Sequence, residues 1–322
     1  MRVVIIGGTG HIGSFLVPRL VRAGHEVIVA SRRARQPYVA DDAWKAVRHI
    51  EIDRVAEDSV GTFAPRIAAL DADAVIDLIC FTPESAQQIV DALQPRQTLL
   101  LHCGTMWVHG AGGGKRQTGG AVTEDAPRDP FGDYGIKKAA IERLLLDETG
   151  GGKARAVVLH PGHLVGPGWN PVNPAGHFNF NVFERIACGE TLVLPNEGME
   201  TVHHVHADDV AQAFELALTH PGQAIGESFH VVSPAPMTLR GYAEAMYAHF
   251  DHRPRLDFLP WDEWRLTVTE QEAAATWDHI AHSPNGSIAK ARQRLGYAPR
   301  YSSLQAVIES ISNRINNHRS VT

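Results

Sequence analysis

Tyr134 and Lys138 place a phenol and an ammonium group four residues apart, at the start of a helical pattern over 134–147. This spacing puts both side chains on one face of a helix, one turn apart. A free tyrosine has a pKa of about 10, and a neighbouring positive charge lowers that pKa toward the range in which the phenol can exchange a proton. The pair suits proton-coupled hydride transfer. The alternative is a surface pair, because the same spacing occurs in many ordinary helices.

Thr105 adds a hydroxyl group shortly after the apolar run at 98–102. We expect this run to be a strand, so Thr105 lies at the carboxyl edge of a sheet. Ligands of open α/β sheets bind at that edge. Thr105 is therefore a candidate contact for the group that reacts.

A glycine turn provides a second kind of chemistry. Gly7, Gly10 and Gly13 follow an apolar run and precede a helical pattern. The first glycine permits a tight turn, the second lets the backbone approach a pyrophosphate, and Gly13 lets the helix pack closely. The anion then lies on the free amides at the helix start, where His11 and Ile12 stand. We predict a nicotinamide or flavin dinucleotide site; the alternative is a simple turn.

The identity of the dinucleotide depends on the end of the second apolar run, where dinucleotide-binding folds carry an acidic residue for the ribose 2'-hydroxyl. This chain has Ser31, Arg32 and Arg33 there. Two guanidinium groups and a hydroxyl suit a 2'-phosphate, so we predict NADP in preference to NAD, which could also bind. The alternative is a solvated basic loop. Asp53, at the end of the next run, is either an acceptor for the adenine amino group or a plain strand-end carboxylate.

The elements that must position these groups alternate along the chain. Apolar runs lie near 2–6, 26–30, 47–52, 74–79, 98–102 and 155–159, and helical patterns near 12–23, 58–70, 84–93 and 134–147. This alternation predicts an α/β fold of Rossmann type, with a doubly wound parallel sheet. Because 322 residues exceed what one core usually serves, we also predict a smaller, mostly helical C-terminal substrate region.

The predicted division assigns residues 1–160, joined by 201–235, to the dinucleotide-binding domain, and 161–200 with 236–322 to the substrate-binding region. Further along the chain, the pattern predicts helices over 178–188 and 208–218 and strands over 201–206 and 228–232. Segment 111–133 has no apolar period and predicts a functional lid or a disordered loop.

Composition excludes several classes of protein. The formal charge is −6, and no lysine and arginine cluster forms a binding stripe, so nucleic acid is not an expected partner. Three scattered cysteines, Cys80, Cys103 and Cys188, suit neither a disulfide framework nor a structural zinc site. No room for a leader precedes the first strand and no apolar run reaches about 18 residues. We therefore expect a cytoplasmic protein that neither spans nor binds a membrane.

Histidines suggest a metal site as an alternative. His203, His204 and His206 are close in sequence, and strand alternation puts His204 and His206 on one face. No carboxylate or thiolate supplies a convincing third ligand. We therefore expect no metal.

With these motifs, the chain resembles the extended short-chain dehydrogenase/reductase superfamily, in its NAD-dependent epimerase/dehydratase group. The resemblance spans nearly the whole chain, because 160–167, 205–211 and 290–299 also look like motifs of that family. It implies that Thr105 is the catalytic Ser/Thr and that Tyr134 and Lys138 are the catalytic Tyr-x-x-x-Lys pair. It also implies that Lys138, His160 and Gly162 contact the cofactor.

Departures from the family pattern bear on the substrate. His160 stands where an Arg is usual, His109 replaces a Tyr, and Val202 stands where sugar-nucleotide members carry an Arg for the diphosphate. Because burying two phosphate charges without partners is costly, we expect a substrate that lacks a diphosphate. A neutral, aromatic pocket is expected from Met106, Trp107, His163, Trp169 and Phe178.

The expected function is an NADP-preferring oxidoreductase or epimerase that acts on a carbinol or ketone of a sugar-like or polyol small molecule. Residue types do not separate an epimerase, which retains its cofactor, from a reductase, which releases it. The alternatives are a nucleotide-sugar epimerase or dehydratase, and a non-catalytic sensor or RNA-associated protein. An apolar stripe on helix 134–147 suits a homodimer, although core burial explains it equally well.

Overall fold

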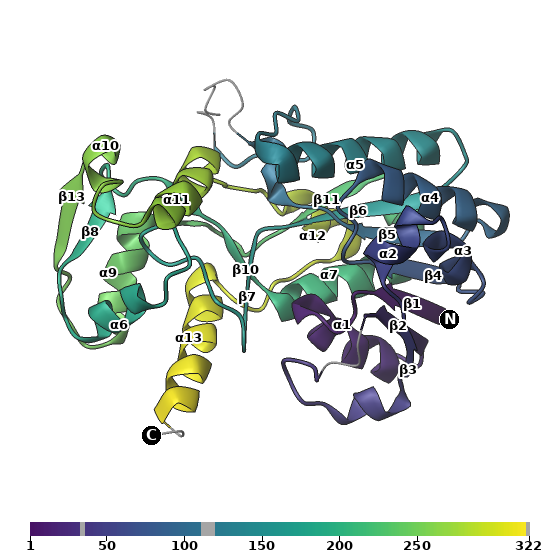
Figure 1. Ribbon diagram of the computed structural model, residues 1–322, viewed down its shortest axis with the longest axis horizontal. Coiled ribbons are helices and arrows are strands. Elements are labelled where there is room, and N and C mark those ends of the chain that lie inside the picture. Colours follow the sequence, from purple (N-terminus) through teal and green to yellow (C-terminus); the bar gives the residue numbers. More distant parts are fainter. Residues whose placement is uncertain (33–35, 111–119, 320–322) are drawn as a thin grey trace.

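The computed structural model describes residues 1–32, 36–110 and 120–319. Its larger lobe is built on a seven-stranded sheet in the order β11-β6-β5-β4-β1-β2-β3, with every neighbouring pair parallel (Figure 1). The strands are β1 (Arg2–Ile6), β2 (Glu26–Ser31), β3 (Arg48–Glu51), β4 (Ala74–Asp77), β5 (Leu99–Cys103), β6 (Arg155–Pro161) and β11 (Ser228–Val231). The predicted Rossmann-type sheet is therefore confirmed.

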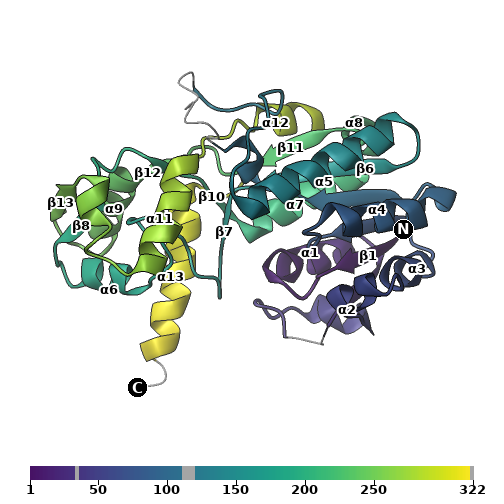
Figure 2. The same ribbon diagram turned by 45° about the horizontal axis from the view of Figure 1, so that its top comes forward.

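Helices cover both faces of this sheet (Figure 2). One face carries α1 (His11–Arg22), α7 (Ala207–Thr219), α8 (Pro221–Ala224) and α12 (Ala289–Leu295). The other carries α2 (Arg54–Ser59), α3 (Phe63–Ala68), α4 (Pro83–Leu93) and α5 (Gly132–Gly150). Short 3-10 helices occur at η1 (Asp42–Ala46), η2 (Gln94–Arg96) and η3 (Met106–His109).

Strand β1 shows why the strands are apolar without interruption. Val3 and Ile5 belong to the core under α1 and α7, whereas Val4 and Ile6 belong to the core under α3 and α4. Side chains alternate between the two faces of a strand, and both faces of this sheet are covered. A continuous apolar run is therefore what such a strand requires.

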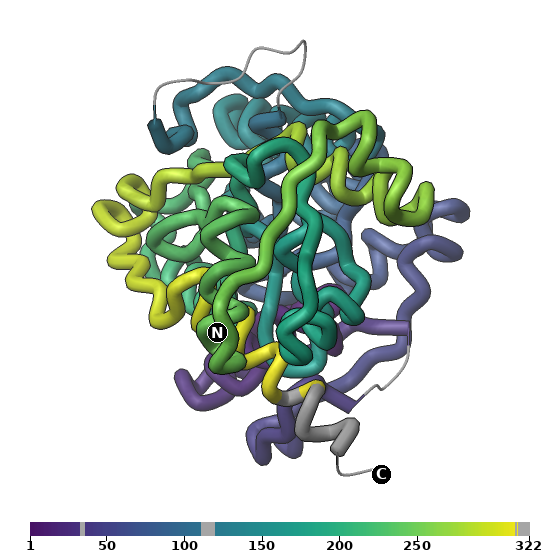
Figure 3. Tube along the Cα trace, turned by 90° about the vertical axis from the view of Figure 1, so that its left-hand side faces the viewer, coloured from purple at the N-terminus to yellow at the C-terminus, as the bar shows by residue number. Residues whose placement is uncertain are grey.

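The second lobe is assembled from two segments that lie far apart in sequence. In the end-on view of Figure 3, the teal chain and the green-to-yellow chain lie together, and β8 pairs with β13 in parallel. Its own core contains large side chains such as Phe183, Tyr242 and Trp264. Its elements are β7 (His163–Val165), α6 (Asn181–Ala187), β8 (Leu192–Pro195), β9 (Thr201–Val202), β10 (His204–His206), β12 (Met237–Thr238), α9 (Leu239–His249), β13 (Leu256–Leu259), α10 (Trp261–Trp264), α11 (Glu270–His282) and α13 (Ser303–Arg319).

Two predicted elements are divided in the structure. The single helix expected over 58–70 is wrong, because Gly61, with a φ of 70°, separates α2 from α3. The single strand expected over 201–206 is also wrong, since β9 pairs with β12 and β10 pairs with β7 in another sheet. None of the helices in the described ranges combines the length and hydropathy that a membrane-spanning segment needs.

Candidate active site

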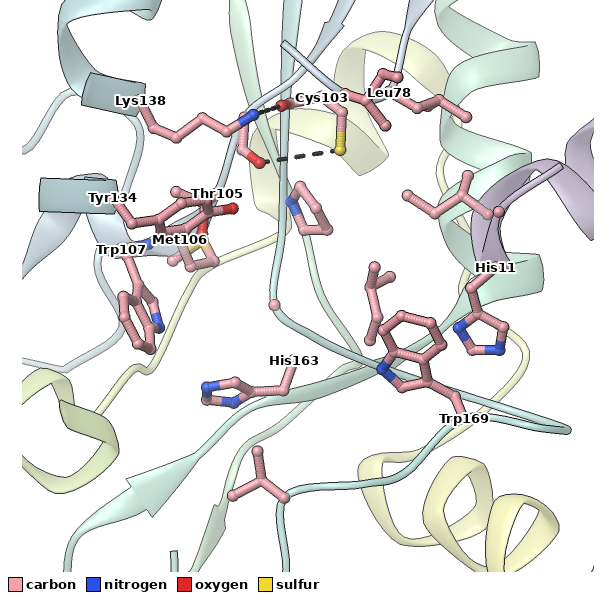
Figure 4. A pocket seen from close by; sticks show the side chains of 18 of the residues that line it. His11, Leu78, Cys103, Thr105, Met106, Trp107, Tyr134, Lys138, His163 and Trp169 are labelled. Atoms are coloured by element: carbon pink, nitrogen blue, oxygen red, sulfur yellow. Dashed lines mark hydrogen bonds between the residues drawn. The ribbon is translucent and has the colours of Figure 1, made fainter. Parts of the chain in front are cut away.

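A cavity of about 760 Å³ lies at the carboxyl edge of the parallel sheet and extends to α11. Figure 4 shows the catalytic candidates on one of its walls and Trp169 with His11 on another. Most of the predicted site residues line this cavity: Gly7, Gly10, His11, Ile12, Arg32, Thr105, Met106, Trp107, Tyr134, Lys138, Gly162, His163, Trp169 and Phe178. The structure does not bring Gly13, Ser31, Asp53 or His160 to the wall, and Arg33 lies outside the described residues.

The glycine turn fits the pyrophosphate of a dinucleotide. Gly7 has a φ of 80°, which favours glycine. A Cβ on Gly13 would lie 1.9 Å from the carbonyl oxygen of Gly8, so only glycine allows this packing. Helix α1 begins at His11, and its N-cap Gly10 supplies no side-chain cap. The first-turn amides of a helix without such a cap are donors for an anion.

At the adenosine end of the expected cofactor site, fewer of the predicted residues line the cavity than at the glycine turn. Arg32 lines the cavity directly after β2, and Ser31 is buried as the last residue of that strand. Asp53 caps α2, because its Oδ1 accepts a hydrogen bond of 3.2 Å from the amide of Ala56. This cap accounts for a carboxylate at position 53, and its contact with adenine stays a prediction.

Lys138 is anchored beneath the cavity. Its Nζ donates to the carbonyl oxygens of Cys80 and Cys103, each at 2.7 Å, and lies 5.9 Å from the ring centroid of Tyr134 (Figure 4). Burial lowers the pKa of this ammonium. The two carbonyl groups thus hold Lys138 on the side of α5 that also carries Tyr134.

Tyr134 differs from our expectation in its acidity. Loss of hydration raises the pKa of its phenol to about 12, and a hydrogen bond with the Thr105 side chain only partly offsets this rise. The expected lowering by Lys138 is wrong for the protein alone, because the ammonium is directed to the two carbonyl groups instead. The phenol is therefore protonated at neutral pH and ready to donate.

Thr105 is oriented by hydrogen bonds to its side chain and from its amide. Its Oγ1 accepts a hydrogen bond of 3.3 Å from the amide of Trp107, which leaves the hydroxyl proton for Tyr134. Its own amide donates to Nδ1 of His160 at 3.0 Å. A Cβ on Gly104 would lie 2.4 Å from that ring nitrogen, so glycine lets the histidine approach.

His160 lies behind the cavity rather than beside the cofactor as expected. It is fully buried, and its Nε2 lies 2.9 Å from Glu142 Oε1. Arg128 grips the same carboxylate with two hydrogen bonds of 2.6 and 2.8 Å. Burial would raise the pKa of Glu142, but His160 and Arg128 hold it well below its usual range. Since the carboxylate accepts from Nε2, Nδ1 is the acceptor that Thr105 needs.

A wall of aromatic rings extends from the phenol across the substrate half of the cavity. Trp107 meets Tyr134 edge to face at 5.9 Å and His279 at 5.7 Å. His279 also contacts His163 at 4.8 Å and Phe178 at 5.3 Å. Opposite this wall, Trp169 stacks on His11 at 4.9 Å. Of the predicted substrate residues, Trp107, His163 and Phe178 therefore share one aromatic wall, Trp169 lies on the opposite wall, and Met106 also lines the cavity.

The histidines around the cavity carry no positive charge at neutral pH. Burial lowers the pKa of His279 to about 4 and that of His11 to about 3. Burial also lowers the pKa of His163 well below its usual value. Across residues 1–32, 36–110 and 120–319, no three histidine, cysteine, aspartate or glutamate side chains gather as metal ligands.

Sequence reasoning missed several lining residues. Phe81 follows β4, and the rule that ligands meet the carboxyl ends of strands could have indicated it. Tyr38 contacts both His11 and Trp169. Asp278 and His279 come from α11, and no motif in the sequence pointed to that helix.

Comparisons with known proteins identify the family of this chain. Residues 3–231 match the model of the NAD dependent epimerase/dehydratase family. Because this match covers more than half of the chain, the protein belongs to that family and is an NAD-dependent enzyme of the extended short-chain dehydrogenase/reductase type. The resemblance inferred from the motifs is confirmed.

Individual relatives are more distant. The chain is 27% identical over 284 residues to 2'-dehydrokanamycin reductase of Streptomyces kanamyceticus, covering 87% of this chain and 76% of the relative. It is 25% identical to the chloroplast stem-loop binding protein of 41 kDa b of Arabidopsis thaliana, covering 96% and 78%. The UDP-glucose 4-epimerase of Thermotoga maritima, solved with UDP-glucose, has a TM-score of 0.72 at 17% identity, covering 99% and 100%. This last likeness shows the fold alone.

Proposed function

We propose that the protein is an NADP-preferring oxidoreductase or epimerase that acts on a carbinol or ketone of a sugar-like substrate lacking a diphosphate. The observation that carries the proposal is the meeting of Thr105, Tyr134 and Lys138 on one cavity wall, next to a glycine turn that fits a dinucleotide. In this proposal, residues 1–160 with 201–235 hold the cofactor, and 161–200 with 236–322 hold the substrate, except that β9 belongs to the second lobe and α12 covers the sheet of the larger lobe.

Each catalytic candidate has one task. The bound cofactor supplies or accepts hydride. Tyr134 gives its proton to the substrate oxygen during reduction and takes it back during oxidation. Thr105 has a single hydroxyl proton, which is directed to Tyr134 in the protein alone and hydrogen-bonds the reacting oxygen when substrate is bound; Lys138 supplies a nearby positive charge for the phenolate. His160, Glu142 and Arg128 position Thr105 through its amide.

Two features support a substrate without a diphosphate. Val202 is buried in the core of the second lobe, so its position offers no donor to the cavity. Arg185 on α6 pairs with Glu190 at 3.1 Å and donates to the carbonyl of Thr191 at 2.7 Å, so it is engaged outside the cavity. One relative is named for a nucleotide-free substrate, 2'-dehydrokanamycin. Others are named for dTDP or UDP sugars, which keeps the nucleotide-sugar alternative open.

Cofactor choice, compartment and oligomeric state each rest on one feature of the chain. Arg32 at the cavity wall supports NADP over NAD. The three cysteines, Cys80, Cys103 and Cys188, are unpaired, which supports a reducing cytoplasm. Ile136 on α5 is 54% exposed, which supports a homodimer through that helix, although Ile141 of the same stripe is buried in the core.

Substitution of Tyr134 by Phe tests the proposal. We expect turnover to fall about 100-fold or more, because the proton donor is lost, while NADP still binds. Mass spectrometry of the released cofactor and a screen of sugars and alcohols by NADPH absorbance identify the parent reaction. A Tyr134→Phe protein that turns over at the parent rate would contradict the catalytic assignment and favour the sensor or RNA-associated alternative.

A further inference from the structure

Asp278 places a carboxylate on the wall of the substrate half. It lies on α11 next to His279, and it is the sole carboxylate among the described residues that line the cavity. Loss of hydration raises the pKa of Asp278, and no cationic side chain of the described residues lies close enough to oppose that rise. The carboxylate thus lacks a positive partner within the described chain.

The other charges of the cavity lie away from Asp278 or are already used. Arg32 belongs to the end that we assign to the cofactor. Lys138 donates to two carbonyl groups beneath Tyr134. His163 and His279 are neutral at neutral pH, because burial lowers the pKa of each. Asp278, whose side chain solvent also reaches, is therefore the one charged side chain of the described residues in the substrate half of the cavity.

The wall beside Asp278 is suited to a cation for a second reason. Phe178 and Trp107 line the same cavity as Asp278, and both rings contact His279 on the same helix. Aromatic faces attract ammonium groups, and the attraction grows as the site loses water. A carboxylate and aromatic rings on the walls of one cavity favour an amine over a hydroxyl group.

From this arrangement we infer that the enzyme is selective for a substrate that bears an ammonium group, of the amino-sugar or amino-alcohol class, and that Asp278 pairs with that group. The inference rests on the proposed function, because it takes the same cavity as the substrate site. The carbinol or ketone of such a molecule faces Tyr134 and Thr105, and its ammonium faces α11. A nucleoside diphosphate has the opposite charge and is disfavoured.

Calorimetry with matched sugars tests the inference. The probes are glucosamine and N-acetylglucosamine, added to protein saturated with NADP, because acetylation removes the charge and keeps the ring. We expect glucosamine to bind about tenfold tighter or better, and Asp278→Asn to abolish this preference. Glu270→Gln is the control variant, since Glu270 lies on the same helix but not on the cavity wall; it should keep the preference.

The outcomes separate the inference from the proposed function. Equal affinities, a preference that survives Asp278→Asn, or no binding of either sugar at millimolar concentration would overturn the inference. Micromolar binding of UDP would overturn it too. NADP-dependent turnover of neutral sugars as fast as of amines would leave the proposed function standing without the inference. Amine-selective binding without any turnover that depends on Tyr134 would leave the inference standing and overturn the proposed function.

Discussion

The two halves of the cavity are built in different ways. In the cofactor half, the contacts come from the backbone around Gly7, Gly10 and Gly13, and their spacing is fixed within one short segment. In the substrate half, the contacts come from side chains such as Trp107, Phe178 and His279, which three separate segments bring together. A backbone site tolerates change in its surroundings, whereas a side-chain site depends on the packing of the whole second lobe.

Buried histidines are a feature that both halves share, with His11 in the cofactor half and His279 in the substrate half. The unfolded chain protonates histidine below a pH of about 6.5, whereas the folded chain keeps the histidines named below neutral to far lower pH. A histidine whose pKa is lower in the folded state than in the unfolded state stabilises the fold above a pH of about 6.5, and this stability is lost as the pH falls. The histidines whose pKa falls to about 3 or 4 are His11, His109, His203, His204, His206, His279 and His282.

The largest predicted effect is therefore acid destabilisation. We expect the free energy of unfolding to fall by several kcal/mol between pH 7.5 and 5.5, at about 1.4 kcal/mol per histidine and pH unit below 6.5. Asp209, whose pKa burial raises to about 6, opposes this trend in part, because its protonation favours the folded state. Urea titrations at several pH values measure the slope. His279→Gln should flatten it and the exposed control His220→Gln should not; equal slopes would contradict the assignment.

The glycine turn should be the most sensitive point of the cofactor half. We expect Gly13→Val to weaken NADP binding about 100-fold or more, roughly 2.7 kcal/mol, because the new Cβ would collide with the carbonyl oxygen of Gly8. Gly150→Ala is the control, since a Cβ there meets no atom within 4 Å. Fluorescence titration with NADPH gives both affinities. Parent-like binding by Gly13→Val would show that this turn does not hold the dinucleotide.

The hydrogen-bond network of His160, Glu142 and Arg128 holds Thr105, which belongs to neither half alone because it contacts the reacting group between cofactor and substrate. We expect Glu142→Gln to lower kcat about 30-fold, roughly 2 kcal/mol, since the charged anchor of His160 is lost. NADP affinity should not change. Asp147→Asn, an exposed position on the same helix, is the control. If Glu142 had only a structural role, kcat of the Glu142→Gln variant would recover fully at lower temperature. His160→Asn, which retains an acceptor for the Thr105 amide, would then have no higher kcat than His160→Ala.

The smallest predicted effect concerns cofactor choice. NADP should bind about tenfold tighter than NAD, or 1.4 kcal/mol, because Arg32 and Arg33 offer planar donors to a 2'-phosphate. The double variant Arg32→Ala with Arg33→Ala should remove this preference, and Arg96→Ala, which pairs with Asp71 at 2.7 Å, should keep it. Calorimetric titration with both cofactors decides. Equal affinities in the parent protein would assign the cofactor half to NAD.

Much of the larger lobe could be predicted because its signals are local. The apolar run at 2–6 became β1, and the glycine turn after it lies where the motif requires. Thr105, Tyr134 and Lys138 line the same cavity because each follows or faces the carboxyl end of a strand. The division of the 58–70 helix was missed, since a single glycine in an otherwise helical pattern does not by itself end a helix.

By itself, the sequence determined the parallel sheet, the glycine turn and the three catalytic candidates, because strand periodicity and short motifs act over a few neighbouring residues. Tertiary structure alone decided that His160 supports Thr105 instead of the cofactor, that Lys138 is held by two carbonyl groups, and that α11 brings Asp278 to the cavity. These outcomes depend on burial and on contacts between distant segments. Such contacts leave no periodic trace in the chain, and burial changes the charge of a side chain without changing its identity.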